Sequence, residues 1–133
     1  MLDPKQVPDV EPEELLARLI IFSSHFRPSE QSVKPDAFIP YPRVDLSVTR
    51  HREASEDELW QEGLRVASTR PVKLYGRADV LAAAFAGVEL QVEAMPLAAN
   101  PNHADVGGWP SDKPAQKMKA LLIANKSRFV PTT

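Results

Sequence analysis

A chain of 133 residues, 43% hydrophobic and 26% charged, is long enough to bury one core and has the composition of a globular domain. It contains no cysteine, which excludes disulfides, thiolate metal ligands and a cysteine nucleophile. A formal net charge of −2, without a stripe of basic and aromatic residues, argues against a nucleic-acid-binding protein.

The first ten residues, MLDPKQVPDV, hold two prolines and little apolar surface. They predict a flexible N-terminal arm, followed by a single domain over residues 11–133. The arm lacks the basic start and apolar run of a secretory signal. No apolar run approaches the roughly 20 residues that a membrane span needs. A cytoplasmic location without membrane contact is therefore expected.

After the arm, we expect a short helix over residues 11–18. Pro12 suits the first turn of a helix, and Glu13 and Glu14 suit the positive end of the helix dipole. The apolar residues that follow predict a buried strand ending near residue 23.

Four prolines between residues 28 and 42 predict an irregular segment, partly of polyproline type. Its aromatic residues, Phe38 and Tyr41, are expected to hold it against the domain. The alternation of apolar and polar residues over 45–50 then predicts a half-buried strand.

The next element is a helix over residues 56–67. Ser55 and Glu58 have the spacing of a capping box, in which each side chain accepts a hydrogen bond from the backbone N–H of the other residue. Pro71 then marks the start of an extended segment, over 72–75.

The alanine-rich stretch 79–86 predicts a short helix that ends at Gly87. A hairpin that turns at this glycine is the alternative. Residues 88–94 alternate between apolar and polar and predict a strand, and a last helix is expected from Pro114 to about Asn125. Strands mixed with three to four short helices predict an α+β fold with a mixed or antiparallel sheet.

The stretch Asn100–Pro110, NPNHADVGGWP, is the densest group of chemically versatile residues. In an extended segment His103 and Asp105 project to the same face. The carboxylate could orient the imidazole for acid–base catalysis, with Arg50 as the contact for an anionic group. Asn-Pro and Gly-Gly also favour turns, so His103 could instead hold a structural corner beside Trp109.

The other candidate binding residues lie in or at the ends of extended segments: Arg50, His51, His25, Ser47, Phe38, Tyr41 and Trp109. The three histidines lack the i, i+4 spacing of a helical zinc motif, so no metal site is expected. No phosphate-loop pattern is present, and no cofactor is expected.

Three short motifs occur in a fixed order: Ala37-Phe38, Leu46-Ser47-Val48 and Asn100-Pro101-Asn102-His103-Ala104. In these the chain resembles a group of small uncharacterised bacterial proteins. The resemblance implies a small bacterial domain that is one component of a larger gene set. It also marks His25, Ser47 and His103 as the polar positions to test.

The sequence favours a non-catalytic accessory subunit that binds another protein in a bacterial multi-component system. Proline-stiffened segments lose little conformational entropy when a partner docks, and the contacts would come from 28–42 and the basic C-terminal helix. The alternative is a small enzyme or a nucleotide- or phosphate-binding domain, with His103 as acid–base and Arg50 as anion contact. A third hypothesis is binding of a nucleotide or an RNA end through Arg50, His51, Arg52 and the lysine-rich C-terminal tail. Whether the chain is an enzyme stays open.

Overall fold

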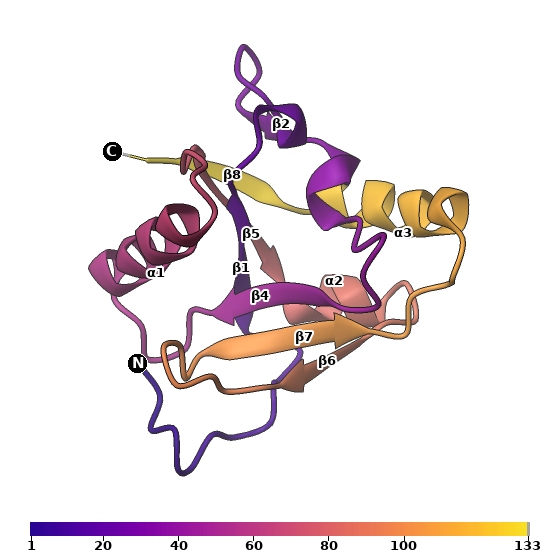
Figure 1. Ribbon diagram of the computed structural model, residues 1–133. Helices are drawn as coiled ribbons and strands as arrows, with labels where there is room; N and C mark the ends of the chain where they lie inside the picture. The colour runs from indigo at the N-terminus through magenta and orange to yellow at the C-terminus, as the bar shows by residue number, and fades with distance from the viewer. Residues whose placement is uncertain (133) are drawn as a thin grey trace.

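Six strands form one antiparallel sheet in the computed structural model, which describes residues 1–132. The order across the sheet is β6-β7-β4-β1-β5-β8, and every neighbouring pair is antiparallel (Figure 1). The sheet strands are β1 (Leu15–Ile20), β4 (Leu46–Arg50), β5 (Gly76–Leu81), β6 (Gln91–Ala94), β7 (His103–Gly107) and β8 (Arg128–Pro131). A separate hairpin pairs β2 (Phe26–Arg27) with β3 (Ser32–Val33).

Three α-helices and two 3-10 turns complete the fold. They are α1 (Glu56–Thr69), α2 (Ala82–Ala86), α3 (Lys113–Asn125), η1 (Ser23–His25) and η2 (Pro35–Phe38). The prediction of a small α+β domain is confirmed. Of the two kinds of sheet expected, mixed or antiparallel, the sheet is antiparallel. No helix within residues 1–132 is long and apolar enough to cross a membrane.

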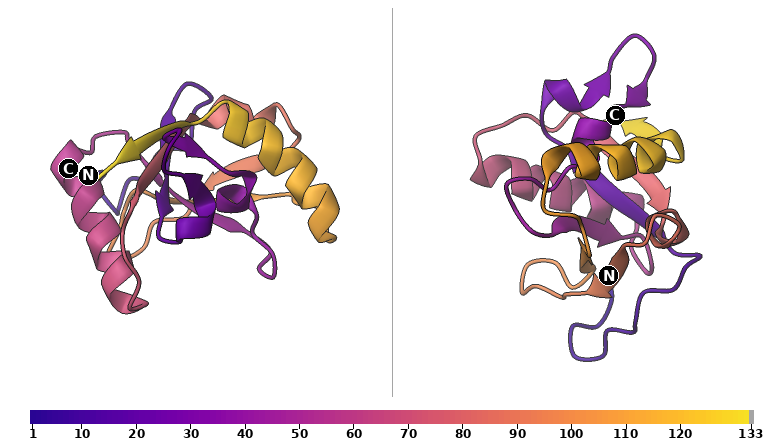
Figure 2. Two further views of the ribbon diagram at one scale, coloured as in Figure 1. Left: turned by 90° about the horizontal axis from the view of Figure 1, so that it is seen from above. Right: turned by 90° about the vertical axis from the view of Figure 1, so that its right-hand side faces the viewer.

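The main core lies on one face of the sheet. Alternate residues of the central strands point to this face and pack against α2, α3 and η2. The largest buried side chains there are Leu16, Ile20, Phe38, Leu46, Val80, Phe85, Val106 and Ile123. Helices α1 and α3 lie on either side of the sheet (Figure 2).

The opposite face is covered in part by α1. Ile21, Ala67 and Leu74 form a small second cluster between this helix and the sheet. Gly63 allows the close approach, because a Cβ atom there would lie 2.8 Å from Cδ2 of Leu74. The C-terminal half of α1 also borders the cleft described below.

Strand β1 pairs very differently with its two neighbours. It pairs with β5 along all six residues, but with β4 only through Leu16↔Arg50 and Ala17↔Thr49. Beyond Ala17 the two strands diverge, and the backbone groups of β4 that face β1 need other partners. This divergence opens the sheet at Arg18.

Two of the expected helical stretches are wrong in part. Residues 11–18 form a turn closed by the Glu14 N–H and the Glu11 carbonyl (3.1 Å), and then β1. Residues 79–81 belong to β5, so only α2 remains of the helix predicted over 79–86. In both places, pairing between β1 and β5 overrides the local helical signal.

The remaining elements agree with the sequence to different degrees. Helix α1 begins at the predicted capping box, with both reciprocal hydrogen bonds present, and α3 ends at Asn125 as expected. Strand β4 matches its prediction, and β6 is shorter than predicted. Strand β7, the hairpin β2–β3 and the C-terminal strand β8 were not predicted.

Residues 1–10, predicted as a flexible arm, lie against the domain. Leu2 is 4% exposed, and its N–H donates to Oδ1 of Asn102 at 2.8 Å. The N-terminal ammonium group lies 3.2 Å from the carboxylate of Glu58. These contacts join the arm to β7 and to the start of α1.

Candidate functional site

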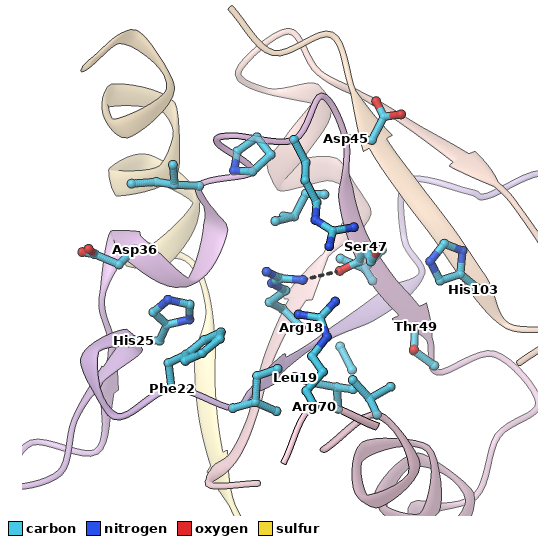
Figure 3. Close-up of a pocket in the computed structure, with 18 of the residues that line it drawn as sticks. Arg18, Leu19, Phe22, His25, Asp36, Asp45, Ser47, Thr49, Arg70 and His103 are labelled. Carbon is cyan, nitrogen blue, oxygen red and sulfur yellow. Dashed lines mark hydrogen bonds between the residues drawn. The ribbon is translucent and has the colours of Figure 1, made fainter. Parts of the chain in front are cut away.

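A cleft of about 450 Å³ lies where β1 and β4 diverge, between α1 on one face of the sheet and η2 on the other. Its floor is formed by β1 and β4, one wall by the C-terminal half of α1, and the other by the segment from η1 to Arg43. The volume is in the range of small-molecule sites. Figure 3 shows the side chains that line the cleft.

The cleft is richer in cations than the protein as a whole. Its lining includes five lysine or arginine residues and three aspartate or glutamate residues, whereas the whole chain carries a net charge of −2. The cationic residues are Arg18, Arg43, Arg65, Arg70 and Lys113. A positive potential is therefore concentrated in a hollow of an otherwise slightly acidic protein.

Arg18 lies at the centre of the cleft. Its Nε donates to the Ala37 carbonyl at 2.8 Å, and its Nη1 donates to the Ser47 carbonyl at 3.0 Å. The guanidinium thus bonds to a β4 carbonyl where pairing with β1 has stopped. These bonds use two of its five N–H groups. Nη2 makes no hydrogen bond, and because no buried side-chain nitrogen or oxygen lacks a partner within residues 1–132, Nη2 is accessible from the cleft.

Arg18 has no carboxylate partner among the described residues. Burial first, and then the nearby positive charges of Arg70 and Arg43, together lower its pKa to about 10. It remains a cation at neutral pH. Its charge is therefore held in a half-buried position beside two like charges.

Arg43 and Arg70 come from loops on the two walls. Arg43 follows a tight turn in which its N–H donates to the Pro40 carbonyl at 2.8 Å, and Arg70 caps the end of α1. Neither forms an ion pair within residues 1–132. Arg65 differs, because Glu62 binds it through two hydrogen bonds of 2.8 and 2.7 Å. We call Arg18, Arg43 and Arg70 the arginine cleft.

The side of the cleft formed by β4 and β7 carries Ser47, Thr49 and His103 (Figure 3). The register pairs Thr49 with His103 and Ser47 with Asp105, so all four side chains point to the same face. Nδ1 of His103 lies 2.9 Å from the Met95 carbonyl, which can only accept, so Nδ1 carries a proton. Nε2 lies 3.6 Å from Oδ1 of Asp105.

His25 and Phe22 line the other side, with ring centroids 5.1 Å apart in an edge-on arrangement. Burial lowers the pKa of His25, and the charge of Arg18 lowers it further, while Asp36 acts in the opposite direction. These effects favour the neutral form of His25. A negative charge added to the cleft would raise its pKa and favour its protonation.

The cleft brings together four of the residues proposed from the sequence, namely His25, Tyr41, Ser47 and His103. Arg50 is not among them. It is fully buried, donates to both carboxylate oxygens of Glu14 at 2.8 Å, and donates to the carbonyls of Pro8 and Asp9. The prediction that Arg50 contacts an anionic ligand is therefore wrong, because all of its charge is already matched inside the protein.

Three other predicted binding residues have structural partners away from the cleft. Nε2 of His51 lies 2.8 Å from Oδ1 of Asp79. Phe38 is 0% exposed in the main core, so it holds the 28–42 segment against the domain, as predicted, but it is not a surface contact. The indole N–H of Trp109 donates to the Val106 carbonyl at 2.9 Å.

The stretch Asn100–Pro110 also serves as a structural corner. Asn100 and Asn102 are 0% exposed. Nδ2 of Asn100 donates to the Thr49 hydroxyl at 3.0 Å, and Nδ2 of Asn102 donates to the carbonyls of Arg50 and Arg52 at 2.7 and 2.8 Å. The asparagines hold the corner, while His103 in the same stretch faces the cleft.

Sequence reasoning missed the three arginines of the cleft. Arg18 carried a local signal, because it interrupts the apolar strand LLARLI, where a charge requires a partner or a ligand. Arg43 and Arg70 carried none, since they sit in loops that only the folded chain brings near Arg18.

Within residues 1–132, no group of three or more histidine, aspartate or glutamate side chains is placed to hold a metal ion. Comparisons of the chain with protein-family models, curated proteins and solved structures each find no match. Its function is therefore inferred from the chemistry of the cleft.

Proposed function

We propose that this protein binds an anionic small molecule in the arginine cleft, with a phosphate or a similarly charged group at Arg18, Arg43 and Arg70. The observation that carries the proposal is that three guanidinium groups converge on one hollow with no carboxylate paired to any of them. Like charges at such a site repel one another, and a bound anion removes that cost.

A group with more than one negative charge fits better than a single carboxylate. Guanidinium groups bind phosphate oxygens through parallel hydrogen bonds, and three of them supply more charge than one carboxylate needs. The hydroxyls of Ser47 and Thr49 lie on the adjacent wall as further polar contacts. A volume of about 450 Å³ exceeds that of a bare phosphate, leaving room for an organic group beside Phe22 and Tyr41.

Calorimetric titration of the protein with inorganic phosphate and with AMP tests the proposal. Binding of either is expected, with a rise in Tm by mass action and shifts of the NMR signals of Arg18 and Ser47. Arg18→Met should weaken binding by about tenfold or more, since it removes the central cation.

Arg128→Gln is the matched control, because Arg128 is an exposed arginine on β8 outside the cleft. It should bind the same anions as the unaltered protein. Absence of binding at millimolar phosphate and AMP would overturn the proposal, and so would equal losses in Arg18→Met and Arg128→Gln.

Catalysis on the bound anion is a second candidate, favoured by the position of His103. Nδ1 donates its proton to the Met95 carbonyl, so Nε2 is the ring nitrogen that could act as a base in the cleft that also holds the arginines. It could accept a proton from a water whose oxygen bonds to the phosphorus of a phosphate ester, while the phosphorus–oxygen bond to the alcohol breaks and the alkoxide or phenolate leaves. Turnover of p-nitrophenyl phosphate that is lost in His103→Gln, with AMP affinity kept, would support catalysis; no turnover by the unaltered protein would remove it.

An accessory subunit that binds another protein, in the bacterial cytoplasm, remains a separate hypothesis. Burial of Phe38 removes one of the two aromatic contacts proposed for it. The basic C-terminal helix, α3, is the other proposed surface, and it carries a feature that the anion-binding function does not explain.

A further inference from the structure

Helix α3 has two apolar stripes rather than one. Ala120, Ile123 and Ala124 are buried against the sheet. On the solvent side, Met118 is 70%, Leu121 46% and Leu122 52% exposed. A surface helix needs only the inner stripe for its own packing.

The outer stripe borders a shallow hollow rather than a flat surface. Met118, Leu121 and Leu122 line it together with Gly87 and Val88, which follow α2, and its volume is about 410 Å³. Residues at positions i, i+3 and i+4 of a helix form a continuous ridge, so the three side chains act as one contact surface. We call this surface the α3 groove.

Every charge on α3 is positive. With 3.6 residues per turn, Lys117 falls on one side of the outer stripe, and Lys119 and Lys126 fall on the other. No aspartate or glutamate occurs over residues 113–126. The apolar ridge is therefore bordered by cations along both sides.

We propose that the α3 groove binds an amphipathic helix of a partner protein, one whose apolar stripe is bordered by acidic residues. Such a helix covers the ridge and places carboxylates against both rows of lysine. A second copy of this chain fits poorly, because two α3 helices packed through the same ridge bring lysine against lysine.

An anionic membrane surface is a poorer occupant than a helix. The hollow is concave, whereas a bilayer presents a broad surface. Three apolar side chains without tryptophan or phenylalanine also make a small membrane anchor.

The test uses a synthetic helical peptide of about 18 residues, with leucine on one face and glutamate on both sides of that face. Titration into ¹⁵N-labelled protein should shift the amide signals of Met118, Leu121 and Leu122. Calorimetry should give an affinity that falls as salt rises. Leu121→Glu should weaken binding by about tenfold or more, by placing a charge on the ridge.

Leu64→Glu is the matched control, since Leu64 is 53% exposed on α1 and lies outside the groove. It should bind the peptide as the unaltered protein does, and so should Arg18→Met, which separates this surface from the anion site. Three outcomes would overturn the proposal: no peptide binding, equal binding of a peptide with lysine in place of glutamate, or equal loss in Leu64→Glu.

Two further measurements distinguish the rival occupants. The unaltered protein should sediment as a monomer and should not bind vesicles that contain phosphatidylserine. A dimer that Leu121→Glu dissociates would assign the groove to a second copy. Vesicle binding that Leu121→Glu abolishes would assign it to a membrane surface.

Discussion

Arg50 and Arg18 lie on neighbouring strands and differ in almost everything else. Arg50 is fully buried, and Glu14 and two backbone carbonyls satisfy it. Arg18 is half-buried, bonds two carbonyls, and has Arg43 and Arg70 as its charged neighbours. A buried charge is stable when it is paired, so the first arrangement serves the fold. The second leaves charge to be matched by a molecule from outside.

The two arginines also belong to different networks. The Arg50 network includes Glu14 and Asn102, and it ties residues 8–14 and the N-terminus to β4 and β7. The arginine cleft is held in place by backbone carbonyls and by loops. Substitutions in the first network should therefore change stability, and substitutions in the second should change ligand binding.

The largest expected effect is that of Arg50→Met. It leaves Glu14 buried without its main partner, which should lower the free energy of unfolding by about 3–5 kcal/mol. Urea denaturation measures the loss. Restoring an apolar pair with Glu14→Leu in the same chain should recover much of it. If Arg50→Met keeps its stability and loses phosphate binding, the Arg50 network is not structural and the arginine cleft is not the separate binding site.

Asn102→Ala should have the next largest effect. The side chain satisfies the Leu2 N–H and the carbonyls of Arg50 and Arg52, all in the interior. Leaving them without partners should cost about 1–3 kcal/mol of stability. Asn125→Ala, at the exposed end of α3, is the control and should change stability little. Equal effects of the two alanine substitutions would show that Asn102 is not a structural anchor.

Local sequence signals predicted the elements that depend on local contacts. The capping box at Ser55 gave the start of α1, and the turn residues of Asn100–Pro110 gave the corner. Strand β1 was missed at its start because Pro12, Glu13 and Glu14 resemble a helical first turn. Its true partner is β5, about sixty residues later, and no local pattern contains that pairing.

The site was predicted only in part for a similar reason. His25, Ser47 and His103 were proposed from the resemblance to small bacterial proteins, and His103 also from its spacing to Asp105; all three line the cleft. Arginine is ambiguous, since Arg18 and Arg50 both sit in strands with apolar neighbours. They differ because Glu14 pairs with Arg50 and not with Arg18, and Glu14 is next to neither arginine in the sequence. Only the folded chain shows which arginine is already paired.

His25 provides a smaller effect with a defined sign. Its pKa is lowered in the folded protein, first by burial and then by Arg18, so the unfolded chain binds its proton more readily. Its contribution to stability is therefore complete above pH 6.5, the ordinary value, and is lost as pH falls through the lowered pKa. Between pH 8 and pH 5, the Tm of His25→Gln should fall less than the Tm of the unaltered protein.

A bound anion should counteract the loss of stability that protonation of His25 causes as pH falls. Sulfate keeps its charge over this range, so any change in its affinity reports on the protein. Protonated His25 beside the arginines adds a cation to the cleft, and sulfate should bind more tightly as pH falls. Sulfate affinity that is independent of pH in the unaltered protein would place the anion away from His25.

The smallest change in stability is expected for Arg70→Gln, and it tests the contrast with Arg50 most directly. Arg70 is exposed, has no ion pair among the described residues, and adds a like charge near Arg18. Removing it relieves repulsion, so the ligand-free protein should keep its stability or gain up to about 0.5 kcal/mol. Binding of AMP should nevertheless weaken by about tenfold, because one of three cations is lost. If Arg70→Gln keeps or gains stability and binds AMP more weakly, Arg70 serves ligand binding. If Arg70→Gln loses stability and keeps its AMP affinity, Arg70 is a structural residue like Arg50.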